Sequence, residues 1–192
     1  GNLGFTQLGR TECARAGGRT NTDFIDNSAG VDLSDHEVNL KILLASAVAR
    51  GVMRDEERDG VLRAVGSDVA AQVLRDNHLQ GRVLSIAERK APLQIDEHRF
   101  LIEDLSADGL LQRKVEKLPE VEDILRLRES RMGLARPHLC VLLAYAKIDS
   151  YTKVLSSSLP DEPELESLLV AYFPDEVARR FPEDIRCHRL PR

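Results

Sequence analysis

The sequence contains no tryptophan, and aromatic side chains make up only 4% of its 192 residues. Because β-sheets draw heavily on aromatic and β-branched residues, this scarcity argues against an all-β fold. With 42% hydrophobic residues, the chain can bury one ordinary core or two small ones, built mostly of leucine, valine, isoleucine and alanine. We therefore expect a mainly α-helical globular protein.

The chain also lacks a strong excess of one charge and any long apolar run. Its 27 basic and 32 acidic residues are mixed along the sequence and give a net charge of −5. This pattern contains no concentrated run of positive charge that would bind a polyanion. The longest apolar runs, such as Leu139–Ala146, are far shorter than the ~20 residues of a membrane span, and no signal-peptide pattern is present. We expect no nucleic-acid partner, no membrane span and a cytoplasmic location.

Closely spaced metal ligands are missing as well. The three cysteines, Cys13, Cys140 and Cys187, form no CxxC pair, and the five histidines occur singly, without an HExxH motif. We interpret the three cysteines as buried thiols. These spacings predict no metal site.

The first 50 residues predict a helix, a short strand, a loop and a second helix. A helical pattern ends at Gly17 and Gly18, and Thr20–Ile25 has the β-branched and aromatic content of a strand emerging into a polar loop, DNSAGVD. Ser34 and Glu37 have the spacing of a capping box, so the next helix is expected to begin at Ser34 and to end near Gly51. One or two short strands are therefore expected near the N-terminus.

The remaining chain has the pattern of charged helices interrupted by glycine and proline. Four or five helices are expected after Arg54, with breaks at Gly66, Gly81, Pro92 and Gly109. The predicted helices of the tail cover about 120–131, 137–155, 163–172, 175–180 and 183–188. We expect three parts: 1–50, a charged helical region at 51–118, and a C-terminal helical domain at 119–192.

Three polar residues are candidates for binding, and each has a simpler structural interpretation. Asn27, after the predicted strand, offers a donor and an acceptor to a ligand but could equally form an Asx-turn. Ser34 could hold an anion at a helix start or only cap the helix. Asn2, between Gly1 and Gly4, lies in a GNLG motif that lacks the full GxGxxG pattern.

A neighbouring cluster of charged side chains also invites an acid–base interpretation. It consists of Asp32, Asp35, His36 and Glu37. Acidic residues are common in the first turn of any well-capped helix, so we favour a capping role for this cluster.

Three segments, GNLGFTQLGR, GGRTNTDFIDNSAGVDLSDHEVNLKILL and RPHLCVLLAYAKI, resemble the C-terminal part of the large NAD-dependent glutamate dehydrogenases of bacteria. The resemblance spans most of the chain. It implies the truncated end of a Rossmann-type NAD-binding domain, within 1–50, followed by a helical bundle-like C-terminal domain. It also implies a parent enzyme that converts L-glutamate to 2-oxoglutarate and ammonia, with hydride transfer to NAD.

The first region is also similar to the smaller hexameric glutamate dehydrogenases, whose pattern A-N-A-G-G-V-x-x-S-Y-x-E can be laid without gaps over Asp26–Glu37. By this resemblance Asn27 contacts the nicotinamide amide of NAD, Ser34 contacts the distal carboxylate of the substrate, and Asn2 lies near the cofactor ribose. The sequence departs from the pattern where Ser28-Ala29 replaces Ala-Gly and where Asp35-His36 replaces an aromatic pair.

The resemblance also implies what this chain does not carry. The GxGxxG turn and the lysines that bind substrate and activate the carbon centre in this family are expected upstream of Gly1, so we expect no catalytic residue here, no activity of the chain alone and no binding of NAD by it. The parent is expected to form a homo-oligomer, and the chain itself could dimerise. The alternative hypothesis is a non-catalytic helical interaction or regulatory module, in which the DNSAG segment is only a turn.

Overall fold

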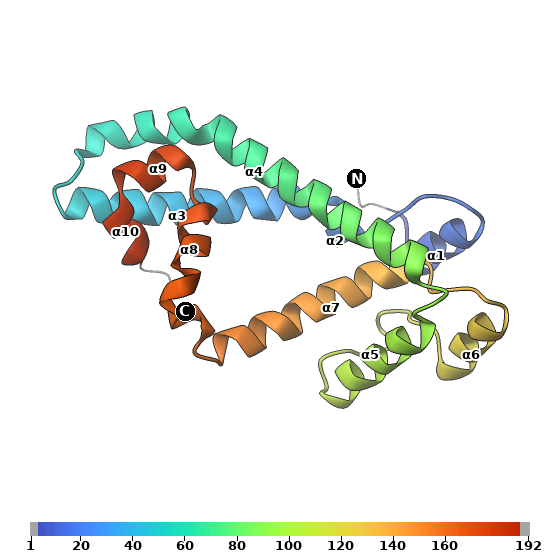
Figure 1. Ribbon diagram of the computed structural model, residues 1–192. Coiled ribbons are helices and arrows are strands. Elements are labelled where there is room, and N and C mark those ends of the chain that lie inside the picture. Colours follow the sequence, from blue (N-terminus) through green and yellow to red (C-terminus); the bar gives the residue numbers. More distant parts are fainter. Residues whose placement is uncertain (1–3, 189–192) are drawn as a thin grey trace. The chain divides into compact units, whose positions relative to one another are not determined.

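A computed structural model describes residues 4–188, and these residues are predominantly helical and contain no strand (Figure 1). The α-helices are α1 (Gln7–Arg15), α2 (Asp23–Asp26), α3 (Ser28–Ala49), α4 (Asp55–Lys90), α5 (Ile95–Ala107), α6 (Val121–Glu129), α7 (Arg136–Leu155), α8 (Glu166–Tyr172), α9 (Asp175–Arg180) and α10 (Pro182–Arg186). Two 3-10 turns, η1 (Leu159–Asp161) and η2 (Pro163–Leu165), precede α8. The expectation of a mainly α-helical protein is confirmed.

The first predicted helix is confirmed together with its stop signal. The hydroxyl of Thr6 accepts a hydrogen bond from the backbone N–H of Gly9 at 3.1 Å, which caps the start of α1. After the helix ends, Gly17 adopts a φ of +90°, a conformation that glycine reaches without steric cost.

The prediction of a strand over Thr20–Ile25 is wrong for the described residues. The carbonyl of Thr22 accepts from the backbone N–H groups of Ile25 and Asp26, both at 3.2 Å, and α2 begins at Asp23. A strand needs a neighbouring strand to satisfy its backbone donors, whereas this turn satisfies them locally. Asp23 adds a favourable negative charge at the helix start and pairs with the guanidinium of Arg10.

The start of α3 was also predicted wrongly. The helix begins at Ser28, six residues before Ser34, so the DNSAGVD segment is mostly helical. The loop-like composition does not break the helix, because none of these residues is proline and Ala29 is a strong helix former. Ser28 Oγ also donates to Asn77 Oδ1 of α4 at 2.9 Å. The predicted end is confirmed, because α3 stops at Ala49 and Gly51 has a φ of +72°.

The breaks predicted at Gly66 and Gly81 are absent, because α4 runs without interruption from Asp55 to Lys90. A glycine inside a helix costs only about 1 kcal/mol relative to alanine, which the surrounding helix formers offset. The breaks predicted at Pro92 and Gly109 are confirmed: they fall after α4 and after α5, and Gly109 has a φ of +72°.

The C-terminal helices follow their prolines closely. The sequence expectation for 175–180 coincides with α9, and α7 starts one residue before the expected position. The segment expected as one helix over 163–172 divides into η2 and α8. Pro163 and Pro182 are the first residues of η2 and α10, Pro137 is the second residue of α7, and Pro174 directly precedes α9. Proline near the first helical position has a backbone angle that already suits a helix, which explains why these starts could be predicted.

The chain forms two compact units that are each discontinuous in sequence. The first comprises 1–27 and 78–153, and the second comprises 28–77 and 154–192. The two units do not test the expected domain limits at residues 50 and 118, which concern the parent enzyme, so these limits stay a prediction.

The core of the first unit joins the end of α4 to α5, α6 and α7. Its members are almost inaccessible to solvent: Leu84, Ala91, Ile95, Ile102, Leu105, Leu111, Leu118, Ile124, Leu134, Leu139, Cys140, Val141 and Leu142, with Ile25 from α2. This unit contains Asn27 and both of the cavities described below. The expectation of buried cysteines is confirmed for Cys140 and wrong for Cys187, which is exposed, whereas Cys13 is partly buried.

In the second unit, α3 and the first part of α4 lie side by side, with α8, α9 and α10 against them (Figure 1). Its core contains Leu40, Leu43, Leu44, Ala47, Met53, Val61, Val65, Val69, Val73, Phe173, Val177, Phe181 and Ile185. The helix α3 contributes Leu40, Leu43, Leu44 and Ala47 to this core, whereas its Val38 is exposed. Ser34 and His36 belong to this unit.

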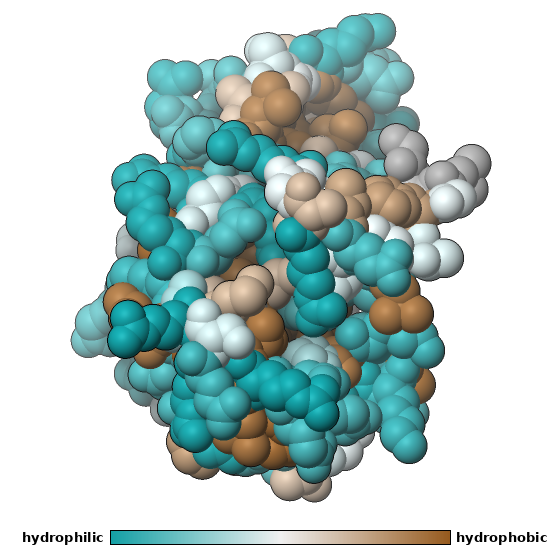
Figure 2. Space-filling view, turned by 90° about the vertical axis from the view of Figure 1, so that its right-hand side faces the viewer, coloured by the Kyte–Doolittle hydropathy of each residue, from teal (hydrophilic) through white to brown (hydrophobic). Residues whose placement is uncertain are grey.

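The face of the molecule in Figure 2 is mostly hydrophilic, with apolar side chains in separate patches. Among the described residues, no helix combines the length and the apolar character that a membrane span requires.

Candidate functional site

The three residues expected to contact ligands differ in what the structure shows of them. Asn2 lies outside the described residues. Asn27 is exposed and is the C-cap residue of α2, where its backbone N–H donates to the carbonyl of Asp23 at 2.9 Å. Ser34 is exposed on α3 and belongs to the other compact unit. Their grouping around one cleft therefore stays a prediction.

The position of Ser34 settles one of its two interpretations. A residue in the seventh position of a helix has its backbone N–H bonded within the helix, and only the first four N–H groups need a cap. The capping interpretation, including the box with Glu37, is therefore wrong. An exposed hydroxyl on a rigid helix remains available for contact with a ligand.

Asn27 keeps both of its interpretations in a modified form. Asn27 follows a helix rather than a strand, and residues 4–188 contain no strand. These residues therefore do not form the sheet edge at which we expected a ligand. Its amide is nevertheless exposed and can both donate and accept.

Arg136, at the start of α7, organises the polar part of the first unit. Its guanidinium donates from Nε to Asn21 Oδ1 at 2.6 Å and from Nη1 to Glu88 Oε2 at 3.0 Å and Ser85 Oγ at 3.2 Å. The side chain is only 14% exposed. These bonds tie the segment between α1 and α2 to α4, beside a cavity of about 670 Å³. In the sequence, Arg136 stood out only as the first residue of the RPHLCVLLAYAKI segment.

Replacing Arg136 by lysine should lower the free energy of unfolding by about 2 kcal/mol, because an ammonium group cannot reproduce the planar fork of bonds. Urea denaturation followed by circular dichroism measures this change. Arg63→Lys, on the same helix as Glu88, is the control. An equal loss of unfolding free energy in this variant would show that the hydrogen bonds of the Arg136 guanidinium do not stabilise the fold.

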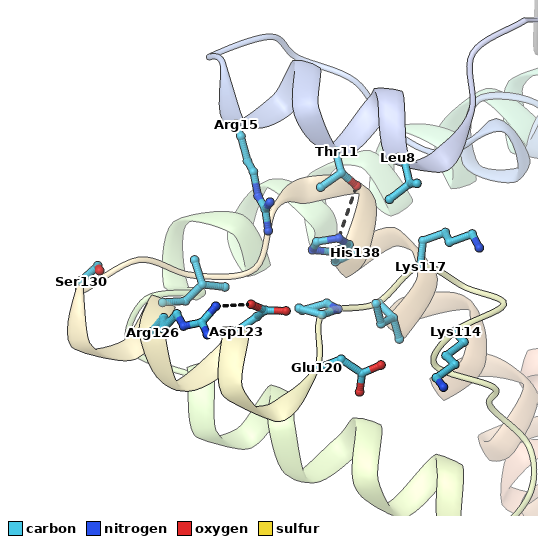
Figure 3. Close-up of a pocket in the computed structure, with 13 residues that line it drawn as sticks. Leu8, Thr11, Arg15, Lys114, Lys117, Glu120, Asp123, Arg126, Ser130 and His138 are labelled. Carbon is cyan, nitrogen blue, oxygen red and sulfur yellow. Dashed lines mark hydrogen bonds and ion pairs between the residues drawn. The ribbon is translucent and has the colours of Figure 1, made fainter.

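A second cavity, of about 680 Å³, is lined by α1, α6, α7 and the loop before α6 (Figure 3). Four of its lining side chains are cationic: Arg15, Lys114, Lys117 and Arg126. Glu120 and Asp123 supply the carboxylates, and Asp123 Oδ1 accepts from Arg126 Nη1 at 3.0 Å. The lining is therefore net positive and favours anionic groups.

Two features distinguish the wall of this cavity from an ordinary surface hollow. Lys117 has a φ of 55°, a left-handed conformation that is uncommon outside glycine. His138 is 2% exposed, and its Nε2 lies 3.3 Å from Thr11 Oγ1, as Figure 3 shows. Burial, assisted by the nearby charge of Arg15, lowers the pKa of His138 to about 4, so the ring is neutral at pH 7.

The amino-acid sequence did not indicate this cavity. His138 appeared only as one of five single histidines, and the basic residues appeared only as part of the mixed charge of the chain. They come from four separated segments, and nothing in their local spacing signals that they converge. The one available clue was position, because His138 follows Pro137 at the start of an apolar helix, where a histidine would be buried.

Comparison with known proteins places the whole chain in one family. Residues 1–87 match the family described as bacterial NAD-glutamate dehydrogenase, catalytic domain, and residues 131–192 match glutamate dehydrogenase, C-terminal. The NAD-specific glutamate dehydrogenases of Pseudomonas aeruginosa, Mycobacterium tuberculosis and Halomonas elongata are 44%, 42% and 40% identical over all 192 residues.

These alignments cover 100% of this chain, including the segment 88–130 that the two family matches leave between them. The chain spans 12% of the length of these curated relatives. The sequence resemblance is thus confirmed, and the chain belongs to the large bacterial NAD-specific glutamate dehydrogenases.

Proposed function

We propose that this chain is part of an enzyme that oxidises L-glutamate with NAD and water to 2-oxoglutarate, ammonium, NADH and a proton. The observation that carries the proposal is the 40–44% identity, over every residue of the chain, to three NAD-specific glutamate dehydrogenases. In this proposal 1–50 is the distal end of the NAD-binding domain, and 51–118 and 119–192 are helical regions that pack on it or between subunits.

The described side chains suit a positioning role better than a catalytic one. The exposed amide of Asn27 has the donor and the acceptor that a carboxamide such as that of nicotinamide requires. The exposed hydroxyl of Ser34 can donate to a carboxylate. Fixing both reactants lowers the barrier by orientation, without any proton transfer by these two residues.

The fit to NAD is partial. The sequence has no GxGxxG turn, so the cofactor pyrophosphate must be held by other parts of the enzyme. When bound, NAD supplies the hydride acceptor. We infer that Asn27 and Asn2 contribute contacts to the cofactor but cannot hold it alone, and that the Rossmann-type arrangement depends on strands outside this chain.

The partners in this proposal are L-glutamate, 2-oxoglutarate and further copies of the enzyme. Exposed apolar residues near the C-terminus support burial against another part of the enzyme or another subunit: Leu159, Leu165, Leu168 and Leu169. We keep the cytoplasm as the proposed location.

An assay of NADH formation separates this proposal from the alternative, a helical interaction or regulatory module without a role at the active site. The full-length enzyme should reduce NAD in the presence of L-glutamate, whereas the 192-residue chain should show no activity above background. Activity of the chain comparable to that of the full-length enzyme would contradict the proposal that the catalytic residues lie in other parts of the enzyme. Full activity of an enzyme that lacks these residues would favour the alternative.

A further inference from the structure

Three potential metal ligands from two helices converge in the second unit. Asp32 and His36 are four residues apart on α3, and Asp76 comes from α4. One ligand atom from each lies within 4.8 Å of the other two. The sequence could not reveal this group, because Asp76 is separated from His36 by 40 positions and α4 was expected to be broken between them.

The position on α3 removes the simpler explanation for two of these residues. Asp32 and His36 lie in the second and third turns of a helix that begins at Ser28, so they do not belong to its first turn. A negative charge benefits a helix mainly within its first turn. The expected capping role of this cluster is therefore wrong. The i,i+4 spacing brings Asp32 and His36 to one face of α3, and Asp76 joins them from α4.

His36 is built into the structure rather than placed on its surface. Its side chain is 4% exposed, and the ring stacks on Tyr172 with centroids 4.3 Å apart and an interplanar angle of 9°. Tyr172 is held in turn, because its hydroxyl accepts from Asn39 Nδ2 at 3.0 Å. The imidazole plane is thus fixed before any ligand arrives, which lowers the entropic cost of binding.

The polar atoms of His36 are poorly satisfied within the protein. Nδ1 is buried and has no hydrogen-bond partner. Nε2 lies 3.8 Å from Asp32 Oδ1, which is too long for a hydrogen bond. Two ligands of one tetrahedral ion with bonds of about 2.1 Å are separated by ~3.4 Å, so this spacing fits two atoms around a common ion better than a direct bond.

The carboxylates provide access and charge. The side chain of Asp32 is 31% exposed and that of Asp76 is 49% exposed, so an ion can reach the buried imidazole from solvent. Asp76 Oδ1 also lies 3.6 Å from Arg75 Nε, so this carboxylate has an ion-pair partner on the exposed side. The mixture of carboxylate oxygen and imidazole nitrogen ligands suits a transition ion such as Zn²⁺ better than Mg²⁺ or Ca²⁺.

We propose that Asp32, His36 and Asp76 form a binding site for a divalent transition-metal ion, with water completing the coordination, that ties α3 to α4. The nearby hydrogen bond from Ser28 to Asn77 already joins the same two helices one turn away. By helical periodicity Ser34 points to the opposite side of α3, so the ion has a structural role and does not contact the substrate. The site is independent of the proposed dehydrogenase activity.

Titration of the tag-free 192-residue chain with Zn²⁺, followed by isothermal calorimetry at pH 7.5, tests the site. The expected result is one equivalent bound with a dissociation constant in the micromolar range or below. Asp76→Asn and His36→Gln should each weaken binding at least about tenfold, since each removes one of three protein ligands. Asp68→Asn, at an exposed position of α4, and Asp35→Asn on α3 should leave it unchanged.

An exposed thiol gives a competing explanation that the experiment must separate. Cys187 is exposed and His188 follows it, so the same titration is repeated with Cys187→Ser. Binding that survives this change and disappears in Asp76→Asn supports the proposal. Binding that disappears in Cys187→Ser but persists in Asp76→Asn overturns it, as does the absence of binding to the wild-type chain.

Thermal unfolding supplies a second readout that does not depend on the calorimetric fit. Zn²⁺ should raise the midpoint for the wild-type chain and for Asp68→Asn, but not for Asp76→Asn, because an ion stabilises only the state that binds it. If His36→Gln unfolds the second unit, Asp76→Asn still decides the question, since the side chain of Asp76 is about half exposed and its replacement leaves no buried cavity. Equal midpoints for all variants with and without Zn²⁺ would contradict the site.

Discussion

Replacing Gly133 by alanine should lower the free energy of unfolding by about 3 kcal/mol, because the added methyl group has no space. Gly133 lies between α6 and α7, against the segment that ends α4. A Cβ atom at this position would meet Ala91 Cβ, and it would lie 2.6 Å from the carbonyl carbon of Ala91 and 2.7 Å from the nitrogen of Pro92. Two of these atoms are backbone, so they cannot rotate away.

The surroundings of Gly133 make relaxation costly. Ala91 is 1% exposed and belongs to the core of the first unit. A shift of the backbone at Ala91 would therefore disturb the packing between the end of α4 and the start of α7. The glycine is required here for close approach, whereas other glycines of the chain are required for their backbone angles.

Urea denaturation of Gly133→Ala, followed by circular dichroism, measures this cost. Gly81→Ala is the matched control in the same unit, because a Cβ at Gly81 meets no atom within 4 Å and the residue lies inside α4. That variant should gain up to about 1 kcal/mol from the higher helix propensity of alanine. Equal stability of the two variants would contradict the close approach at Gly133.

The second large effect concerns the pH dependence of folding at His138. Burial lowers the pKa of this ring from 6.5 to about 4, so the folded protein resists protonation while the unfolded chain does not. The contribution of the neutral His138 ring to the free energy of unfolding is therefore fully present above pH 6.5. It is lost as the pH falls from 6.5 toward 4, because the unfolded chain takes up the proton that the folded protein excludes. At pH 5 the loss amounts to about 2 kcal/mol for this group.

His138→Gln isolates this contribution from the other groups that titrate. Between pH 7.5 and pH 5, the wild-type free energy of unfolding should fall by about 2 kcal/mol more than that of the variant. His78→Gln removes an exposed imidazole and controls for the substitution itself. A parallel pH dependence of the wild type and His138→Gln would show that the ring accepts a proton in the folded state.

Local signals predicted the helices well where a terminus depends on one residue and its neighbours. Gly51 and Gly109 were correctly assigned as stops, because only a residue tolerant of positive φ suits such a turn. The proline-started helices of the tail were likewise found near their true positions. In each case the free energy that decides the boundary lies within a few residues of it.

Predictions failed where distant contacts decide the conformation. Ser34 and Glu37 have a capping-box spacing, yet α3 starts at Ser28, whose hydroxyl bonds to Asn77 nearly 50 residues away. The strand expected at Thr20–Ile25 depended on a sheet, and no described residue supplies one. Tertiary contacts override local propensity in both cases.

The candidate site was predictable only to the extent that it depends on resemblance. The local pattern singled out Asn27 and Ser34 as candidates, and only the overlay on a family pattern assigned them ligands. The family itself is confirmed, whereas these roles stay a prediction. Arg136, His138 and the Asp32–His36–Asp76 group were not selected, because their partners come from other helices. A single sequence without a template does not reveal which helix faces meet.

We propose that Asn27 positions the cofactor and Ser34 the substrate of a glutamate dehydrogenase. The most direct measurement is the steady-state kinetics of the full-length enzyme carrying Ser34→Ala or Asn27→Ala, with Ser67→Ala on α4 as an exposed control. Loss of a hydrogen bond to a charged carboxylate costs about 1.5–3 kcal/mol. Ser34→Ala should therefore raise KM for L-glutamate about 10- to 100-fold and leave KM for NAD unchanged.

Asn27→Ala should show the reverse pattern, raising KM for NAD about tenfold through loss of a neutral hydrogen bond while affecting KM for L-glutamate little. Ser67→Ala should match the wild-type enzyme in both constants. Wild-type values of both constants, with unchanged kcat, in Ser34→Ala and in Asn27→Ala would contradict the account.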